Sequence, residues 1–323
     1  MTLGTRAFFW LFLGLSSMAS AQVHDLRLNQ IQVKGTHNSY HQQSLIAFHP
    51  SHKYTHLSLT DQLEKRGIRA FELDVHRPSF GSNLLVYHIA VIDAKTSCKK
   101  FKDCLQELKN WSDQHPDHVT IFVWIEIKDA TGGPKFANFD RVDEEIRDVL
   151  GDQVLTPDAI QKNYESLQAA VQQEGWPQIA ETRGKFMFML DQDERNAQVY
   201  LRNDSLQGRA MFVRASEETL NSPWAVVTKT GPGSFHAKAM QKNFIVSENI
   251  CSPELTAAEC YSKLENARVA GTHILMDDFE GDEKKQSNGD YYIRFDVNST
   301  ANCNPQTASM TCNSFEIDQE SFR

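Results

Sequence analysis

Residues 68–75 read IRAFELDV, an apolar run that carries two carboxylates near its end. Side chains two positions apart lie on the same face of a strand, so Glu72 and Asp74 share one face and the apolar residues between them take the other. This pattern predicts a strand that presents charge at its C-terminal end. Apolar runs that we interpret as strands recur at 31–36, 68–75, 84–88, 119–127, 185–190, 210–214, 244–247 and 272–276.

Amphipathic segments with helical spacing separate several of these runs. Ser58 is a predicted N-cap for a helix that stops at Gly67, and apolar stripes follow over 100–114, 139–150 and 256–270. Eight strands with helical connections predict a parallel (β/α)₈ TIM-type barrel. The helices are uneven and two connections are irregular, so a distorted or incomplete barrel stays open as an alternative.

The two ends of the chain are expected to differ from the barrel. Residues 1–21 have a short basic start, an apolar core too short to span a bilayer and a small-residue cleavage site near Ala21, which predicts a signal peptide. The remaining residues, 22–323, are expected to form a single domain that is secreted or periplasmic. Within it, residues 291–297 are expected to form an edge strand ahead of a cysteine-bracketed tail.

Six cysteines lie after the predicted signal peptide and fall into three pairs that are close in sequence. An exported protein meets an oxidising compartment, where such pairs form disulfides. Local pairing is favoured, although the sequence leaves other connectivities open. The favoured pairs are Cys98–Cys104, Cys251–Cys260 and Cys303–Cys312, the last of which would staple the C-terminal tail.

The formal net charge of −9 opposes binding to nucleic acid and does not help adhesion to anionic membranes. Contact with a lipid surface therefore has to come from apolar loops or from the active site itself. Residues 45–50 (LIAFHP), together with Tyr54, are candidates for an apolar rim that makes peripheral membrane contact. We expect the protein to be a monomer.

Polar side chains gather where the predicted strands end, which is where barrels of this kind place their chemistry. The run 31–36 leads into His37 and Asn38, the run 84–88 ends in His88, and Glu126 and Lys128 share a face at the end of the fourth run. A single polar residue at a strand end is commonly just solvated. Here, however, one end of the predicted barrel would bring together an amide, three carboxylates and two imidazoles. Such a combination predicts a functional site.

Three carboxylates so near to one another cannot all stay ionised without a cation among them. Oxygen donors from amide and carboxylate side chains, without thiolates, fit calcium better than zinc. Two histidines beside that cation are candidates for a general base and a general acid. His49, His52 and His56 also suggest zinc, but they lie in a loop-like run broken by Pro50, so we do not favour a zinc site there.

The chain resembles the calcium-dependent phosphoinositide-specific phospholipase C family, in its small, secreted, microbial-type branch. The similarity is strong over roughly residues 30–130 and thinner from 131 to 323. It is carried by GTHNSYH (35–41), GIRAFELDVH (67–76), LLVYHIAV (84–91) and VTIFVWIEIKD (119–129). The resemblance implies a catalytic phospholipase C-like barrel over 22–323. It also implies a catalytic pair, His37 and His88, and the calcium ligands Asn38, Glu72, Asp74 and Glu126.

The activity implied is cleavage of phosphatidylinositol-type lipids to diacylglycerol and a cyclic or acyclic inositol phosphate. The last two predicted strands read FIVSENI (244–250) and HILMDDF (273–279), which are acidic rather than basic, so plain phosphatidylinositol or a related phosphodiester is expected. Lys128 either contacts the phosphate or pairs with a neighbouring carboxylate. Two alternatives remain: a glycerophosphodiester phosphodiesterase, and a non-catalytic barrel that binds an inositol or sugar headgroup.

Overall fold

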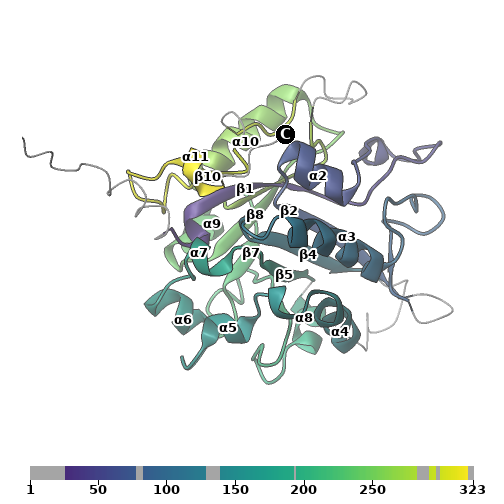
Figure 1. Cartoon of the computed structure of the whole chain (residues 1–323). Coiled ribbons are helices and arrows are strands. Elements are labelled where there is room, and N and C mark those ends of the chain that lie inside the picture. The colour runs from purple at the N-terminus through teal and green to yellow at the C-terminus, as the bar shows by residue number, and fades with distance from the viewer. Residues whose placement is uncertain are drawn as a thin grey trace, which may run out of the picture.

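The structure is a computed structural model, and it describes residues 26–77, 83–128, 139–192, 194–281, 291–295 and 299–318. The predicted signal peptide lies outside these residues, so the boundary near Ala21 stays a prediction. The described residues form a single domain built around one central sheet, with the helices surrounding the strands (Figure 1).

Eight parallel strands form the wall of a nearly closed barrel, in the order β6-β5-β4-β2-β1-β9-β8-β7. A single bridge between Arg214 and Val227 joins the two ends of this order. The predicted TIM-type barrel is therefore confirmed. The strands are β1 (Ile31–Thr36), β2 (Ala70–His76), β4 (Ile121–Ile127), β5 (Phe186–Asp191), β6 (Met211–Val213), β7 (Val227–Lys229), β8 (Ile245–Cys251) and β9 (Ile274–Asp277).

Strands β1 and β2 pair through one register position only, Gly35 opposite Ala70. A side chain at Gly35 would collide with its surroundings, because an added Cβ would lie 2.8 Å from the Cβ of Ala70 and closer still to the sulfur of Met276. Glycine therefore allows β1 to pass between its two neighbours. On the other side, β1 pairs with β9 over four positions, from Val33 to Thr36.

Two of the strand predictions were wrong. The run 84–88 is not part of the barrel wall, because β3 (Leu85–Val86) runs antiparallel to the C-terminal end of β2. The eighth strand of the barrel is instead β7, a three-residue segment. Residues 291–295 are not a strand, and the edge strand is β10 (Ala301–Cys303), which pairs antiparallel with β1 (Figure 1).

The predicted helix boundaries are largely confirmed. The Ser58 hydroxyl accepts a hydrogen bond from the Asp61 amide at the start of α2, and Gly67 ends that helix in the left-handed conformation at φ 63°. The connection from β6 to β7 has no helix. The helices are α2 (Leu59–Arg66), α3 (Phe101–Gln114), α4 (Phe139–Leu150), α5 (Pro157–Gln161), α6 (Leu167–Gln173), α7 (Ile179–Thr182), α8 (Glu194–Tyr200), α9 (Ser234–Gln241), α10 (Ala257–Ala270) and α11 (Ser314–Ile317), with 3₁₀ turns at Leu28–Gln30, Pro50–His52 and Gly151–Gln153.

All six cysteines form the three local disulfides that the sequence favoured. The bond between Cys98 and Cys104 ties the loop before α3 to that helix, and the bond between Cys251 and Cys260 ties the end of β8 to α10. The bond between Cys303 and Cys312 closes the tail that follows β10. The disulfide-stapled tail is therefore confirmed.

Candidate active site

A cavity of about 450 Å³ opens at the C-terminal ends of the barrel strands. Its wall is strongly polar and carries both signs of charge. It is lined by His37, Glu72, Glu126, Asp191, Arg214, Lys229, Thr230, Gly231, Glu248, Asn249 and Lys263. The residues at its centre come from β2, β4, β5 and β7, which places the site where a parallel barrel carries its chemistry.

Three of the predicted metal ligands form one compact group. Strands β2 and β4 are neighbours, and Asp74 lies directly opposite Glu126 in their register. Carboxylate oxygens of Glu72, Asp74 and Glu126 lie within 4.8 Å of one another. Lys128 also reaches this group: its Nζ lies 2.9 Å from Glu126 and 3.5 Å from Asp74, so it pairs with neighbouring carboxylates.

Asp74 is the most deeply buried of the three carboxylates. Its side chain is fully buried, and neither carboxylate oxygen has a hydrogen-bond partner of good geometry among the described residues, although Tyr40 and Lys128 lie close to it. Burial, together with the carboxylates of Glu126 and Glu72 and against the opposing effect of Lys128, raises the pKa of Asp74 to about 8. A bound divalent cation would satisfy these oxygens, so the residues present fit a calcium ion.

Asn38, the predicted amide ligand, is buried, does not line the cavity and has a left-handed backbone at φ 45°. Its amide nitrogen donates to the Tyr54 hydroxyl, and its carbonyl oxygen accepts from the Tyr40 hydroxyl, both at 3.1 Å. These two tyrosines hold the orientation of the amide. Tyr54 is buried and therefore does not belong to the apolar rim, so that part of our prediction was wrong.

His37 faces the cavity with its Nε2, which lies 3.7 Å from Glu72. On the other side of the ring, Nδ1 contacts the Asp278 carboxylate at 2.7 Å. Burial by itself lowers the pKa of His37, but the carboxylates of Asp278 and Glu72 outweigh it and raise the pKa to about 9. Asp278 therefore orients the ring and favours its protonated form.

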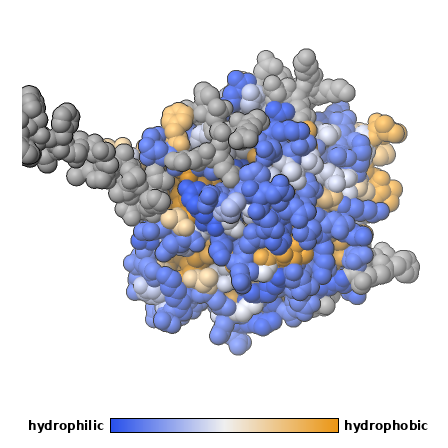
Figure 2. Space-filling view, viewed as in Figure 1, coloured by the Kyte–Doolittle hydropathy of each residue, from blue (hydrophilic) through white to orange (hydrophobic). Residues whose placement is uncertain are grey.

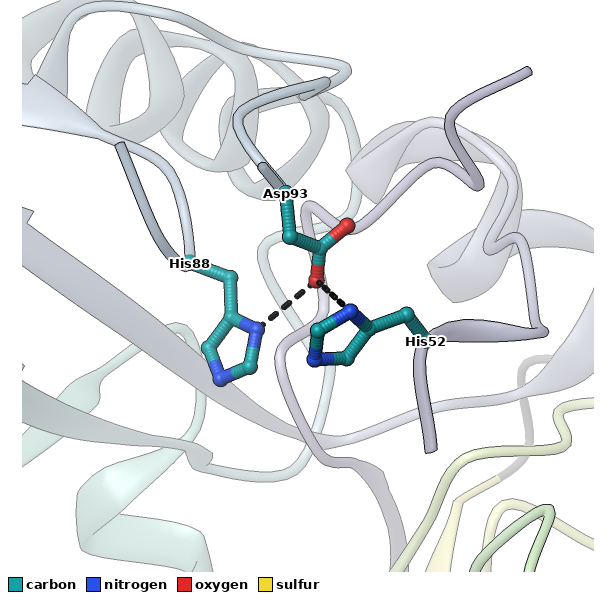
Figure 3. A group of neighbouring side chains, drawn as sticks. All are labelled: His52, His88 and Asp93. Atoms are coloured by element: carbon teal, nitrogen blue, oxygen red, sulfur yellow. Dashed lines mark hydrogen bonds and ion pairs between the residues drawn. The ribbon is translucent and has the colours of Figure 1, made fainter. Parts of the chain in front are cut away.

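His88 belongs to a different hydrogen-bonded group and does not line the cavity described above. Its Nδ1 contacts Asp93 at 2.8 Å (Figure 3), and the side chain is 20% exposed. The same carboxylate accepts hydrogen bonds from His41. Despite burial, which acts the other way, these histidines lower the pKa of Asp93 and hold it as a carboxylate.

Sequence reasoning missed three cations that line the cavity, Arg214, Lys229 and Lys263. Lys229 ends β7 and lies 2.7 Å from Glu72 and 3.0 Å from Asp191, while Arg214 follows β6 and lies 2.6 Å from Asp191. The prediction that the late strands are acidic holds for 244–250 and 273–279 but overlooked these two positions. Arg214 closes the predicted strand 210–214 and was visible there, whereas the strand that carries Lys229 is too short to show a pattern.

A parallel barrel that groups carboxylates and histidines at its strand ends has the features that metal-assisted hydrolases use. Comparison with known families makes the assignment specific. The family described as "Phosphoinositide phospholipase C, Ca2+-dependent" matches this chain over residues 26–83 and 81–305. The chain belongs to this family, and it is a phosphoric diester hydrolase with calcium as cofactor. No curated protein matches the chain.

Solved structures of bacterial proteins share the fold. A Ca²⁺-dependent phosphatidylinositol-specific phospholipase C from Streptomyces antibioticus is 22% identical, with a TM-score of 0.61 over 79% of this chain and 95% of that chain. A calcium-dependent phosphoinositol-specific phospholipase C from the Gram-negative bacterium Pseudomonas sp. is 15% identical, also with a TM-score of 0.61, over 88% and 97% of the two chains. At these identities the likeness is one of fold.

Proposed function

We propose that the protein is an exported calcium-dependent phosphodiesterase that cleaves phosphatidylinositol-type lipids into diacylglycerol and a cyclic inositol phosphate. The observation that carries this proposal is the buried Asp74 carboxylate, which accepts no hydrogen bond from the described residues and lies between two other carboxylates. Such a group either keeps a proton or takes a cation, and Lys128 at 3.5 Å only partly offsets its charge. A divalent ion bound there attracts a phosphate. The proposed ligands are Asn38, Glu72, Asp74 and Glu126.

Bound calcium supplies positive charge beside the phosphate, which favours ionisation of the attacking inositol hydroxyl and stabilises the charge of the transition state. His37 is placed to donate from Nε2 to a phosphoryl oxygen, because Asp278 occupies its other nitrogen. The attacking hydroxyl loses its proton to Glu72 or Asp74, the carboxylates at the end of β2.

His88 is proposed as the acid that protonates the departing diacylglycerol oxygen. The proposal is supported by its place in the family motif at 84–91 and by its contact with Asp93. A carboxylate on Nδ1 orients the ring and stabilises the imidazolium, so that the remaining nitrogen can release a proton to the leaving group. Asp93 is therefore a positioning residue for His88.

The proposed headgroup is inositol without additional phosphates. Arg214 and Lys229, the two cations that face the cavity from β6 and β7, are each paired with Asp191 at 3.0 Å or less. Lys229 is also paired with Glu72. Lys263, the third cation that lines the cavity, donates to the backbone carbonyl of Asn249 and lies near the Glu248 carboxylate. Cations that already hold carboxylates or carbonyl groups have little charge left for extra phosphate groups, which supports a neutral sugar ring.

The proposed membrane contact is formed by two neighbouring loops. The backbone of Gln42 hydrogen-bonds to that of Lys95, which holds the loop before α2 against the loop after β3. The exposed apolar side chains on these loops are Leu45, Ile46, Phe48, Ile89, Val91 and Ile92. Figure 2 shows a largely hydrophilic face with hydrophobic residues gathered at the edge where Figure 1 places these loops. Such a patch supports peripheral contact with lipid.

Export is supported by the predicted signal peptide at 1–21, and its cleavage leaves a secreted or periplasmic domain. Among the residues that the structure describes, no helix has the length and apolar character required to cross a membrane. Membership of the phospholipase C family supports the proposed activity over both alternatives, the glycerophosphodiester phosphodiesterase and the non-catalytic barrel.

The test is hydrolysis of phosphatidylinositol and of glycerophosphocholine, each with calcium and with excess chelator. We expect phosphatidylinositol alone to be cleaved, activity to vanish in chelator, and calcium to restore it better than zinc. Phosphorus NMR of the early reaction should show inositol 1,2-cyclic phosphate first. An acyclic phosphate that appears without any cyclic species would identify water as the nucleophile and overturn the mechanism.

A further inference from the structure

A second group of side chains that are able to hold a metal ion shares no member with the three carboxylates at the end of β2 and β4. His52 ends the turn Pro50–His52, and His88 and Asp93 lie in the loop after β3. One ligand atom from each of the three lies within 4.8 Å of the other two. Figure 3 shows both histidine rings turned toward one oxygen of Asp93, at 2.8 Å for His88 and 3.7 Å for His52.

His52 supplies an independent sign that this group binds a ligand. The residue is 7% exposed, and its Nδ1 atom has no hydrogen-bond partner within the described residues. That nitrogen nevertheless points at the Asp93 carboxylate (Figure 3). A buried polar atom without a partner is costly and calls for an explanation, and a bound ion is one such explanation. The partly exposed side chain of His88 gives an ion a path from solvent.

The donor set identifies the class of ion. Two imidazole nitrogens and one carboxylate oxygen suit zinc, whereas calcium prefers oxygen donors only. Bonds of about 2.0–2.1 Å in a tetrahedral site place neighbouring donor atoms roughly 3.3 Å apart. The two observed separations, 2.8 and 3.7 Å, lie on either side of that value. His41 contacts both oxygens of Asp93 and so fixes the carboxylate from outside, as a second layer of residues does in metal sites.

We propose that His52, His88 and Asp93 form an inhibitory site for Zn²⁺, with water as the fourth ligand. Zinc takes the place of the proton on His88 Nδ1 and becomes the partner of Asp93. Nε2 of His88 then keeps its proton, so the ring can no longer donate a proton to the leaving group and take one up again in each catalytic cycle. Zinc binding stands on the geometry alone, whereas the inhibition rests on the role proposed for His88.

The experiment combines calorimetry and activity on the full chain, at saturating calcium so that the carboxylate site is filled. We expect the wild type to bind one Zn²⁺ and to lose activity on phosphatidylinositol vesicles over the same zinc range. His52→Gln should keep the basal activity but weaken zinc binding and inhibition together by tenfold or more, since it removes a direct ligand. His115→Gln is the matched control, because the ring of His115 contacts Trp111 and Glu64 and no member of the proposed site, so this variant should respond like the wild type.

Two results would overturn the site. The first is the absence of zinc binding at saturating calcium. The second is zinc inhibition that additional calcium relieves, or that His52→Gln leaves unchanged, because both would place zinc at the carboxylates instead. Tight binding that depends on His52 but does not inhibit would keep the site and refute the role of His88, so the two proposals fail separately. Unfolding curves of both variants check that the fold is retained.

Discussion

Replacing Asp74 by asparagine should stabilise the calcium-free protein, which is the opposite of what loss of a buried polar contact normally does. In the folded wild type the pKa of Asp74 is raised from 3.8 to about 8, so the folded state holds a proton that the unfolded state releases. Stability therefore falls as pH rises from about 4 to about 8 and is level above that range. At about 1.4 kcal/mol per pH unit, the cost at pH 7 is about 4 kcal/mol. Asp74→Asn removes that cost.

The assay is urea unfolding at several pH values, in chelator and in saturating calcium. In chelator the wild type should lose stability between pH 5 and pH 8, and Asp74→Asn should be more stable at pH 7 with a flatter dependence on pH. Calcium should stabilise the wild type strongly and the variant weakly. Asp191→Asn is the control, because that carboxylate is paired with Arg214 and Lys229, and its loss should destabilise the protein in both buffers. The reasoning fails if Asp74→Asn destabilises the calcium-free protein and calcium still protects it fully.

Four further substitutions separate the roles of the two histidines and the apolar loops. His88→Ala should be rescued by a substrate with a good leaving group, which needs no acid, whereas His37→Ala should stay slow with the same substrate in a continuous release assay. Asp278→Asn should lower the pKa of His37 and move the high-pH limb of the kcat/KM profile to lower pH; an unmoved limb would count against protonated His37 as the active form. Phe48→Ser should reduce activity on vesicles several-fold while leaving hydrolysis of a water-soluble inositol phosphodiester unchanged, and equal losses on both would contradict a lipid contact.

The sequence was informative where strands are long and apolar. Strands β2 and β4 have seven residues each, and their pattern alone placed Glu72, Asp74 and Glu126 at one end of the barrel. Parallel pairing then brings the ends of neighbouring strands together, so three predicted ligands meet without any further information. The calcium interpretation needed only the types of these side chains.

Short segments gave no such signal. Strand β7 has three residues, and its pairing depends on β8 and on the single bridge that joins the two ends of the sheet. Lys229 reaches Glu72 because the barrel closes, which is a property of the whole chain. Conversely, the run 84–88 has the apolar character of a barrel strand, yet β3 runs antiparallel to β2 and pairs only with the C-terminal end of that strand. Composition cannot distinguish these two situations.

The pairing of His37 with Asp278 shows why the histidine environments were beyond sequence reasoning. The acidic end of 273–279 was apparent, but its contact depends on β9 lying beside β1, so that the last barrel strand meets the first. Thr36 and Asp277 are register partners, and the next residue of each strand carries one half of the pair. The narrow contact at Gly35 leaves β1 attached to β2 at one position and to β9 at four. His37 therefore takes its orientation from the closing strand, and a change that loosens the β1–β9 pairing should impair this histidine before it disturbs the carboxylates on β2 and β4.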